Sequence, residues 1–195
     1  MLTSFGDTGI THTFLVDYEL AAIQAIRVTF QDAVLKSCAF HFRQAILRRV
    51  QQEGLKTQYE NKDDVTVYNW VKRLMSLCML LTFAIGYAWK WLQQPPSTGS
   101  AATDAKLCAL ASYFGRTWIT GEFQARMIQL QAGRTPKPRR RCYVDNDAKL
   151  WSAKQQYEIR IASVFTYLFP HPQAWAEFRS ATETYLDHCG HMLGL

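Results

Sequence analysis

The chain has 195 residues, of which 48% are hydrophobic and 19% are charged, so it is not a disordered polymer. This length allows one folded domain, with room for a small appendage, and the net charge of +6 favours an acidic partner. Five irregularly spaced cysteines and the lack of a secretory signal in Met1–Asp7 predict a reducing compartment, the nucleus or alternatively the cytoplasm.

The first elements in chain order are a strand, a helix and a second strand. Thr13–Val16 is an uninterrupted apolar run that predicts a short buried strand. Apolar residues then recur at helical spacing from about residue 19 to residue 29, and residues 33–40 form a second strand candidate. Strand, helix and strand in so short a span predict a parallel pair with a right-handed crossover.

Helices are expected in the rest of the chain. One begins near His41, and another, capped by Asn61, continues until Pro95–Pro96. A further helix is capped by Thr103, and the segment from residue 148 onward is again helical. We therefore expect an α/β fold, with a small parallel sheet near the N-terminus and a predominantly helical remainder.

One apolar run is long enough to require a comparison with membrane spans. Leu74–Trp89 holds sixteen residues without a charge, whereas a spanning helix needs roughly 20 apolar residues. A buried helix is the favoured interpretation, and a membrane partner is not expected. The alternative is a small membrane or interaction protein that inserts or docks this segment.

Several separate blocks of the chain share the pattern of one known family. Phe14–Ile26 reads FLVDYELAAIQAI, Cys38–Phe42 reads CAFHF, and Ser112–Ile119 reads SYFGRTWI. Together these blocks resemble the transposases of Mutator-like elements (MULE), over about residues 13–119. The resemblance implies an RNase H-like fold and a DDE-type enzyme that cuts and joins DNA with Mg²⁺ or Mn²⁺.

Asp17 is the first candidate catalytic residue and magnesium ligand. It stands at the end of the first predicted strand, where ligands of open α/β sheets gather, and its carboxylate is the oxygen donor that Mg²⁺ prefers. The resemblance implies that it is the second of three catalytic acids, which together clamp two ions. The alternative is an aspartate that caps the following helix.

The other two acids of the family have no counterpart in this chain. The first belongs to a strand far upstream of the second, and the third belongs to an Arg-Thr-Asn-Asn-x-x-Glu context that is missing here. We therefore expect the single chain to be inactive, with the missing carboxylates supplied by a second copy or by a longer transposase chain.

Cys38 and His41 form a Cys-x-x-His pair, which is a hallmark of the resembled family. The spacing suits Zn²⁺, but a zinc site normally has four ligands, so this pair is half a site. His188 and His191 near the end of the chain could complete it. The alternative is a buried cysteine that packs as a small hydrophobe and a histidine tucked under a helix start.

A basic run holds most of the net charge. Its five basic residues are Arg134, Lys137, Arg139, Arg140 and Arg141, and without them the remainder carries about +1. They could contact DNA phosphates or direct nuclear import. The alternative is a solvated loop, which the prolines in the run favour.

The predicted organisation has four parts, and the functions follow from them. Residues 1–55 form the partial RNase H-like core, 56–133 a helical region, 134–147 a basic loop that contains proline, and 148–195 a helical C-terminal segment to which the family resemblance does not extend. The leading hypothesis is a remnant of a DNA transposase. The alternative from another class is a non-catalytic protein, DNA-binding or regulatory, built on the same remnant.

Overall fold

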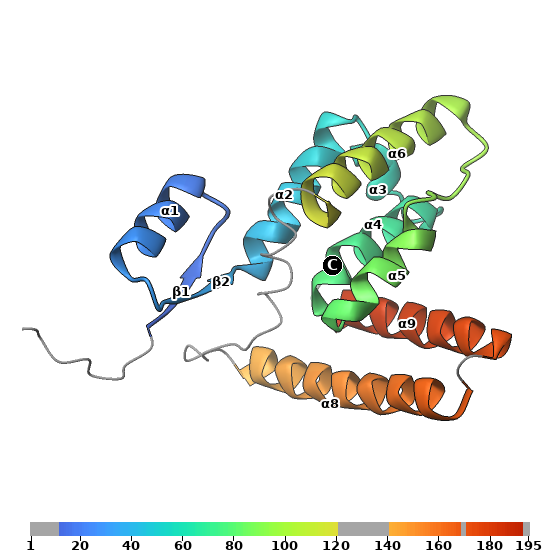
Figure 1. The fold of residues 1–195 in the computed structure, drawn as a ribbon. Coiled ribbons are helices and arrows are strands. Elements are labelled where there is room, and N and C mark those ends of the chain that lie inside the picture. The colour runs from blue at the N-terminus through green and yellow to red at the C-terminus, as the bar shows by residue number, and fades with distance from the viewer. Residues whose placement is uncertain (1–11, 121–140, 169–170, 193–195) are drawn as a thin grey trace, which may run out of the picture.

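The computed structural model describes residues 12–120, 141–168 and 171–192. Most of these residues are helical, and two short strands form a small parallel sheet near the N-terminus (Figure 1). The prediction of a small N-terminal sheet followed by a predominantly helical remainder is therefore confirmed. The RNase H-like assignment is finer than this description and stays a prediction.

The strand–helix–strand unit forms as its sequence predicts. Strand β1 (Thr13–Val16) is followed by helix α1 (Leu20–Thr29) and strand β2 (Val34–Ser37). The strands are parallel, with Thr13 opposite Val34 and Val16 opposite Ser37. Since a parallel pair needs a crossover, α1 carries the chain back to the start of the sheet.

The two faces of this sheet differ in burial because side chains alternate along a strand. Val16 and Leu35 point to one face and bury Ile23 of α1, which forms a small apolar cluster. On the other face Leu15 is 68% exposed and Val34 is 40% exposed. Among the described residues, the sheet thus has one covered face and one open apolar face.

The remaining elements are helical. They are α2 (Ala39–Gln52), α3 (Lys56–Tyr59), α4 (Thr66–Ser76), a short turn η1 (Leu77–Met79), α5 (Thr82–Leu92), α6 (Ala101–Phe114), η2 (Gly115–Ile119), α8 (Arg141–Ser163), η3 (Val164–Leu168) and α9 (Pro172–Met192). Helices α2, α4, α5, α6, α8 and α9 all contribute buried side chains to one apolar core. By packing, α2 therefore joins the helical region rather than the small N-terminal cluster.

Two predicted helix starts differ from the observed ones. Helix α6 begins at Ala101 because Ser100, not Thr103, is its N-cap, and the Ser100 hydroxyl accepts the backbone N–H of Thr103. Helix α4 begins at Thr66, and Asn61 instead accepts the backbone N–H of Asp63 in the preceding turn. Serine and threonine have similar capping ability, which explains the shift in α6. The N-cap position of α4 is Val65, which makes no side-chain capping bond, and the carboxylate of Asp64 instead accepts the backbone N–H of Thr66.

The apolar run Leu74–Trp89 is not one continuous helix, contrary to the prediction. The chain leaves α4 after Ser76 and starts α5 at Thr82, while Leu77 and Leu80 are fully buried at the bend. The run has no polar face, so the bend lets both helices bury it. None of the helices in the described segments is long and apolar enough to cross a membrane.

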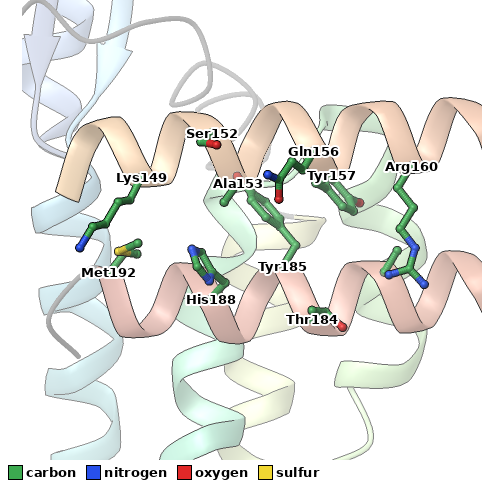
Figure 2. Close-up of a pocket in the computed structure, with 11 residues that line it drawn as sticks. Lys149, Ser152, Ala153, Gln156, Tyr157, Arg160, Thr184, Tyr185, His188 and Met192 are labelled. Atoms are coloured by element: carbon green, nitrogen blue, oxygen red, sulfur yellow. The ribbon is translucent and has the colours of Figure 1, made fainter. Parts of the chain in front are cut away.

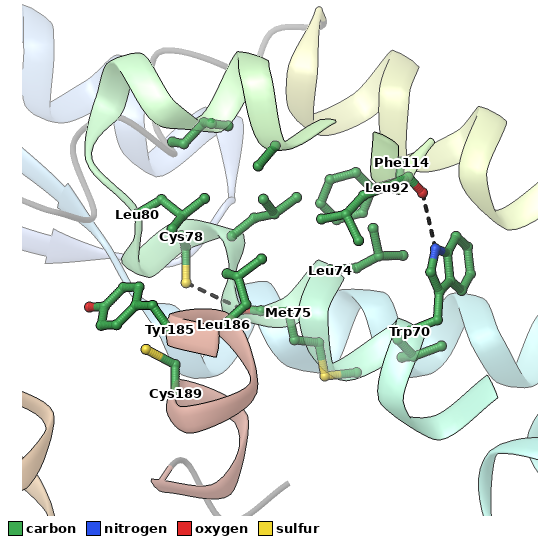
Figure 3. Packing of buried hydrophobic residues seen from close by; sticks show 14 of the residues in the cluster. Trp70, Leu74, Met75, Cys78, Leu80, Leu92, Phe114, Tyr185, Leu186 and Cys189 are labelled. Atoms are coloured by element: carbon green, nitrogen blue, oxygen red, sulfur yellow. Dashed lines mark hydrogen bonds between the residues drawn. The ribbon is translucent and has the colours of Figure 1, made fainter. Parts of the chain in front are cut away.

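Contacts from distant residues hold this bend in place. The Tyr185 hydroxyl of α9 donates to the Met79 carbonyl at 3.3 Å, which satisfies a backbone group that the broken helix leaves open. At the other end, the Trp70 indole N–H donates to the Leu92 carbonyl at 3.0 Å and ties α4 to α5 (Figure 3). The two helices are thus fixed as an antiparallel pair.

Helices α8 and α9 form a hairpin that packs on α4. The rings of Tyr157 and Tyr185 stack between them, with centroids 4.5 Å apart and an interplanar angle of 4°. The Arg73 guanidinium of α4 donates to both carboxylate oxygens of Asp187, at 2.6 and 2.7 Å. These hydrogen bonds raise the pKa of Arg73, and they hold α9 against α4.

The buried hairpin predicts a loss of stability at alkaline pH. Burial raises the pKa of the Cys189 thiol from 9.0 to about 12 and that of the Tyr157 phenol from 10.0 to about 12. Since the folded state holds these protons more tightly, their contribution is complete below about pH 9 and is lost as the pH rises towards 12. Urea unfolding at pH 7, 9 and 10.5 should show this decrease.

A Cys189→Ala variant provides the control, because it removes the thiol that begins to titrate first in the unfolded chain. Its free energy of unfolding should decrease less between pH 9 and 10.5 than that of the parent chain. Equal slopes for the two proteins would contradict the assignment of this alkaline loss to the buried thiol.

Candidate functional site

The carboxyl edge of the small sheet holds the residues that the sequence analysis selected. Asp17 directly follows β1 and Cys38 directly follows β2, after the paired residues Val16 and Ser37. The Cys38 N–H donates to the Val16 carbonyl at 3.0 Å and extends the ladder by one bond. Because the strands are parallel, Asp17 and Cys38 leave the sheet side by side.

Asp17 is exposed, and its hydrogen bond is local. Its Oδ1 atom accepts the backbone N–H of Glu19 at 3.2 Å. Glu19 is itself the N-cap of α1, and no side chain caps that helix. Asp17 therefore closes the turn between strand and helix instead of capping α1 directly. Its carboxylate remains at the surface, where a cation from solvent can reach it.

The Cys-x-x-His pair lies at the start of α2. Cys38 is the N-cap residue of this helix, and it is a free, half-buried cysteine whose side chain makes no capping bond. His41 is exposed, and its ring lies 5.5 Å from that of Phe40. The histidine is thus not tucked under the helix, which differs from the packing alternative drawn from the sequence.

The described residues bring no third ligand to this pair. In residues 12–120, 141–168 and 171–192, no three His, Cys, Asp or Glu side chains lie together as metal ligands would. The composite zinc site, in which His188 and His191 would join Cys38 and His41, is therefore not assembled in this part of the chain. Asp17 is accordingly one carboxylate of the three that a two-metal site requires.

An aromatic cluster connects the carboxyl edge to the helical core. We call it the aromatic junction and define it as Tyr18, Phe42, Phe114 and Trp118. The Trp118 ring lies 4.8 Å from that of Tyr18 at 84°, and 4.8 Å from that of Phe42 at 88°. Phe42 also meets Phe114 at 6.2 Å. These edge-to-face contacts are the favoured geometry for aromatic pairs.

The aromatic junction joins the three quoted blocks of the family resemblance, of which the third is far from the other two in sequence. Tyr18 and Phe42 belong to the first two blocks, and Trp118 belongs to the third. Trp118 is only 2% exposed and Phe42 is fully buried, so the contact is part of the core. Since Tyr18 is bonded to Asp17, Trp118 helps to fix where the carboxylate stands. No local signal in the sequence predicts this pairing.

Gly115 lies against the Trp89 ring, beside the aromatic junction. Trp89 of α5 stacks on Phe114 with centroids 5.3 Å apart and an interplanar angle of 26°. A Cβ atom on Gly115 would lie 3.0 Å from Cζ2 of Trp89, which is tighter than nine in ten real Cβ contacts, so the Trp89 ring would have to shift by a few tenths of an ångström. The absence of a side chain at Gly115 therefore lets the Trp89 ring stack on Phe114 without a steric clash.

The predicted DNA contacts lie outside the described residues. Arg134, Lys137, Arg139 and Arg140 fall in the segment that the structure does not describe, and Arg141 begins α8 with a side chain that is likewise not described. Their role thus stays a prediction from the sequence.

Comparison of the chain with protein-family models, with curated proteins and with solved structures finds no match. The resemblance to MULE transposases therefore rests on the quoted motifs and their order. That Tyr18, Phe42 and Trp118 of these motifs lie in contact is a separate observation, made from the structure.

The aromatic junction gives a stability prediction. Trp118→Ala should lower the free energy of unfolding by about 3–5 kcal/mol, because it removes a large buried ring and leaves a cavity. Trp118→Phe should cost less, since it keeps a ring against Tyr18 and Phe42. Urea denaturation followed by circular dichroism measures both values.

Trp151→Ala is the matched control, because Trp151 is 61% exposed on α8. Its effect should stay within about 0.5 kcal/mol. Similar losses for Trp118→Ala and Trp151→Ala would show that the junction does not hold the N-terminal unit on the core.

Proposed function

We propose that the chain is a MULE transposase-like protein, a remnant of a DDE-type enzyme that binds DNA without cutting it as a single chain. What supports this proposal is the carboxyl edge of the sheet. Two parallel strands end in Asp17 and in the Cys-x-x-His pair, in the order that the resemblance implies. The third block packs against the same edge through Trp118 and Tyr18.

The missing acids limit the chemistry of this site. When bound, a divalent ion of the Mg²⁺ or Mn²⁺ type would activate and stabilise the oxygens of a phosphodiester. Asp17 could hold such an ion through one oxygen, but a two-metal clamp needs further carboxylates. In this proposal they come from a second copy of the chain or from a longer transposase, and the isolated chain is inactive.

Association with DNA is the function that remains to the single chain. The net charge is +6, and the basic run between Arg134 and Arg141 carries most of it. Such residues bind phosphates by releasing counterions, without reading the base sequence. The same run suits nuclear import, so we place the protein in the nucleus.

The first test asks whether the chain cuts DNA. Purified protein is incubated with supercoiled plasmid and Mg²⁺ or Mn²⁺, beside an Asp17→Asn variant, and nicked product is measured on gels. We expect no nicking above background from either protein. Nicking that Asp17→Asn abolishes would overturn the proposal that the single chain is inactive.

The second test measures DNA binding and its dependence on salt. Replacing Arg139, Arg140 and Arg141 with Gln should weaken binding to duplex DNA and reduce the slope of log K against log salt by up to about 3. Fluorescence anisotropy between 50 and 200 mM salt, roughly the range in which such contacts weaken, gives both quantities.

The control for this test removes three charges elsewhere. Arg48, Lys56 and Lys62 are exposed on α2, α3 and the following loop, so their replacement with Gln changes the net charge equally. If both triple variants lose the same affinity, the basic run is not the binding site. If the parent chain does not bind DNA at all, the proposed function is wrong.

A further inference from the structure

The outer edges of the small sheet are not used by the proposed function. In the part of the chain that the structure describes, β1 and β2 pair only with each other, so each strand has one edge without a partner strand. The sheet and α1 extend from the helical core at the start of α2 (Figure 1). Unpaired N–H and C=O groups along such an edge can bind a further strand.

The hydrogen bonds between the strands show which residues face outwards. The Val34 N–H donates to the His12 carbonyl at 2.8 Å, so the backbone of His12 faces β2. Successive residues of a strand direct their backbone groups to opposite edges, so Thr13 and Leu15 face the outer edge of β1. Leu15 therefore offers one N–H donor and one C=O acceptor at this edge.

The two outer edges differ in charge. The four residues of β1 include no charged residue and no proline, whereas β2 contains Lys36. Lysine and proline are among the residues by which proteins prevent edge strands from pairing with other chains. Two copies of β1 can therefore lie side by side without repulsion, while two copies of β2 would bring their lysines together.

The open face of the sheet also favours a further strand at β1. Parallel sheets occur almost only where both faces are covered, yet the Leu15 side chain is 68% exposed on this face. A sheet of two strands is marginal, and three or more strands are more stable. A strand added at β1 would lie directly beside Leu15.

The helical surface offers no comparable set of backbone groups, because helices satisfy theirs internally. In the groove between α8 and α9, Figure 2 shows Lys149, His188 and Arg160 on the rim. The rings of Tyr157 and Tyr185 below them are each only 4% exposed. The edge of β1 is thus the better candidate for a specific contact.

We propose that the outer edge of β1 binds the same edge of a second copy of the chain, antiparallel to it, about a twofold axis at Leu15. Directly opposite residues of an antiparallel pair can exchange both of their hydrogen bonds, so each Leu15 satisfies the other. The two exposed leucine side chains lie next to each other, and the two small sheets become one sheet of four strands. Twofold contacts are the commonest kind in protein oligomers.

This arrangement has a consequence for Asp17, which alone rests on the proposed function. Asp17 lies two residues beyond the axis, so the two copies of Asp17 are four residues apart along the strands, roughly 14 Å at about 3.4 Å per residue. The ions of a two-metal site are only about 3.5–4 Å apart. The second copy therefore does not complete the clamp, which leaves a longer transposase chain as the source of the missing carboxylates.

Analytical ultracentrifugation of the full chain tests the contact, from about 1 µM to about 1 mM, the range in which small interfaces dissociate. We expect an equilibrium between monomer and dimer. Leu15→Pro should weaken the dimer about tenfold or more, because proline removes one outward N–H from each copy. The bonds between β1 and β2 are kept, and circular dichroism checks the fold of the variant.

Ser37→Pro is the matched control, because it removes an outward N–H from the edge of β2 and should leave the dissociation constant unchanged. Hydrogen exchange of the parent chain gives a readout without mutation. The Leu15 amide should exchange more slowly as the concentration rises, whereas the Phe14 amide, which faces β2, should change less.

Three results would overturn the proposal. They are a chain that is monomeric at every concentration, a dimer that Leu15→Pro and Ser37→Pro weaken equally, and a Leu15 amide that is equally protected at all concentrations. The last result would show that another part of the same chain pairs with β1.

The contact between copies and the proposed function can fail separately. The variant in which Arg139, Arg140 and Arg141 are replaced with Gln should form the dimer as the parent chain does. A parent chain that forms the dimer but does not bind DNA would support the contact and overturn the proposed function alone. A chain that binds DNA and stays monomeric would do the reverse.

Discussion

The aromatic contact of Trp118 with Tyr18 and Phe42 is the constraint on which the N-terminal site depends. In the part of the chain that the structure describes, the sheet has two strands, and its own cluster buries Val16, Ile23 and Leu35. Two strands and one helix bury too little apolar surface to be stable in isolation. The unit is ordered because the loop after Asp17 and the start of α2 pack on the helical core through Trp118.

The C-terminal hairpin makes a second set of contacts that stabilise the helical core. Arg73 and Asp187 join α4 to α9 with two short hydrogen bonds, and Tyr185 binds the carbonyl group left open at the bend after α4. Helix α9 thus stabilises α4 and the bend that follows it, although more than a hundred residues separate them in sequence. These contacts help to explain why α8 and α9 share a core with helices α2, α4, α5 and α6.

The sequence predicts the elements that have a local cause. The strand–helix–strand unit follows from two apolar runs that flank a segment with helical periodicity. The bend at residues 77–81 contains no glycine or proline that would predict it, and a hydrogen bond from Tyr185 of α9 helps to hold it. For the same reason Asp17 and Cys38 could be placed at one edge from the sequence, whereas Trp118 could not be placed beside them.

The open face of the small sheet has a practical consequence. Leu15 and Val34 project from it into solvent, and Phe40 at the start of α2 is 55% exposed. Uncovered apolar side chains favour association between molecules during expression and concentration, and so do strand edges without a partner, such as the outer edges of β1 and β2 among the described residues. Replacing Leu15 with lysine would place a charge on this apolar face and leave the opposite face, which packs on α1, unchanged. Leu15 is therefore a surface position at which self-association can be reduced without changing the apolar cluster of the small sheet.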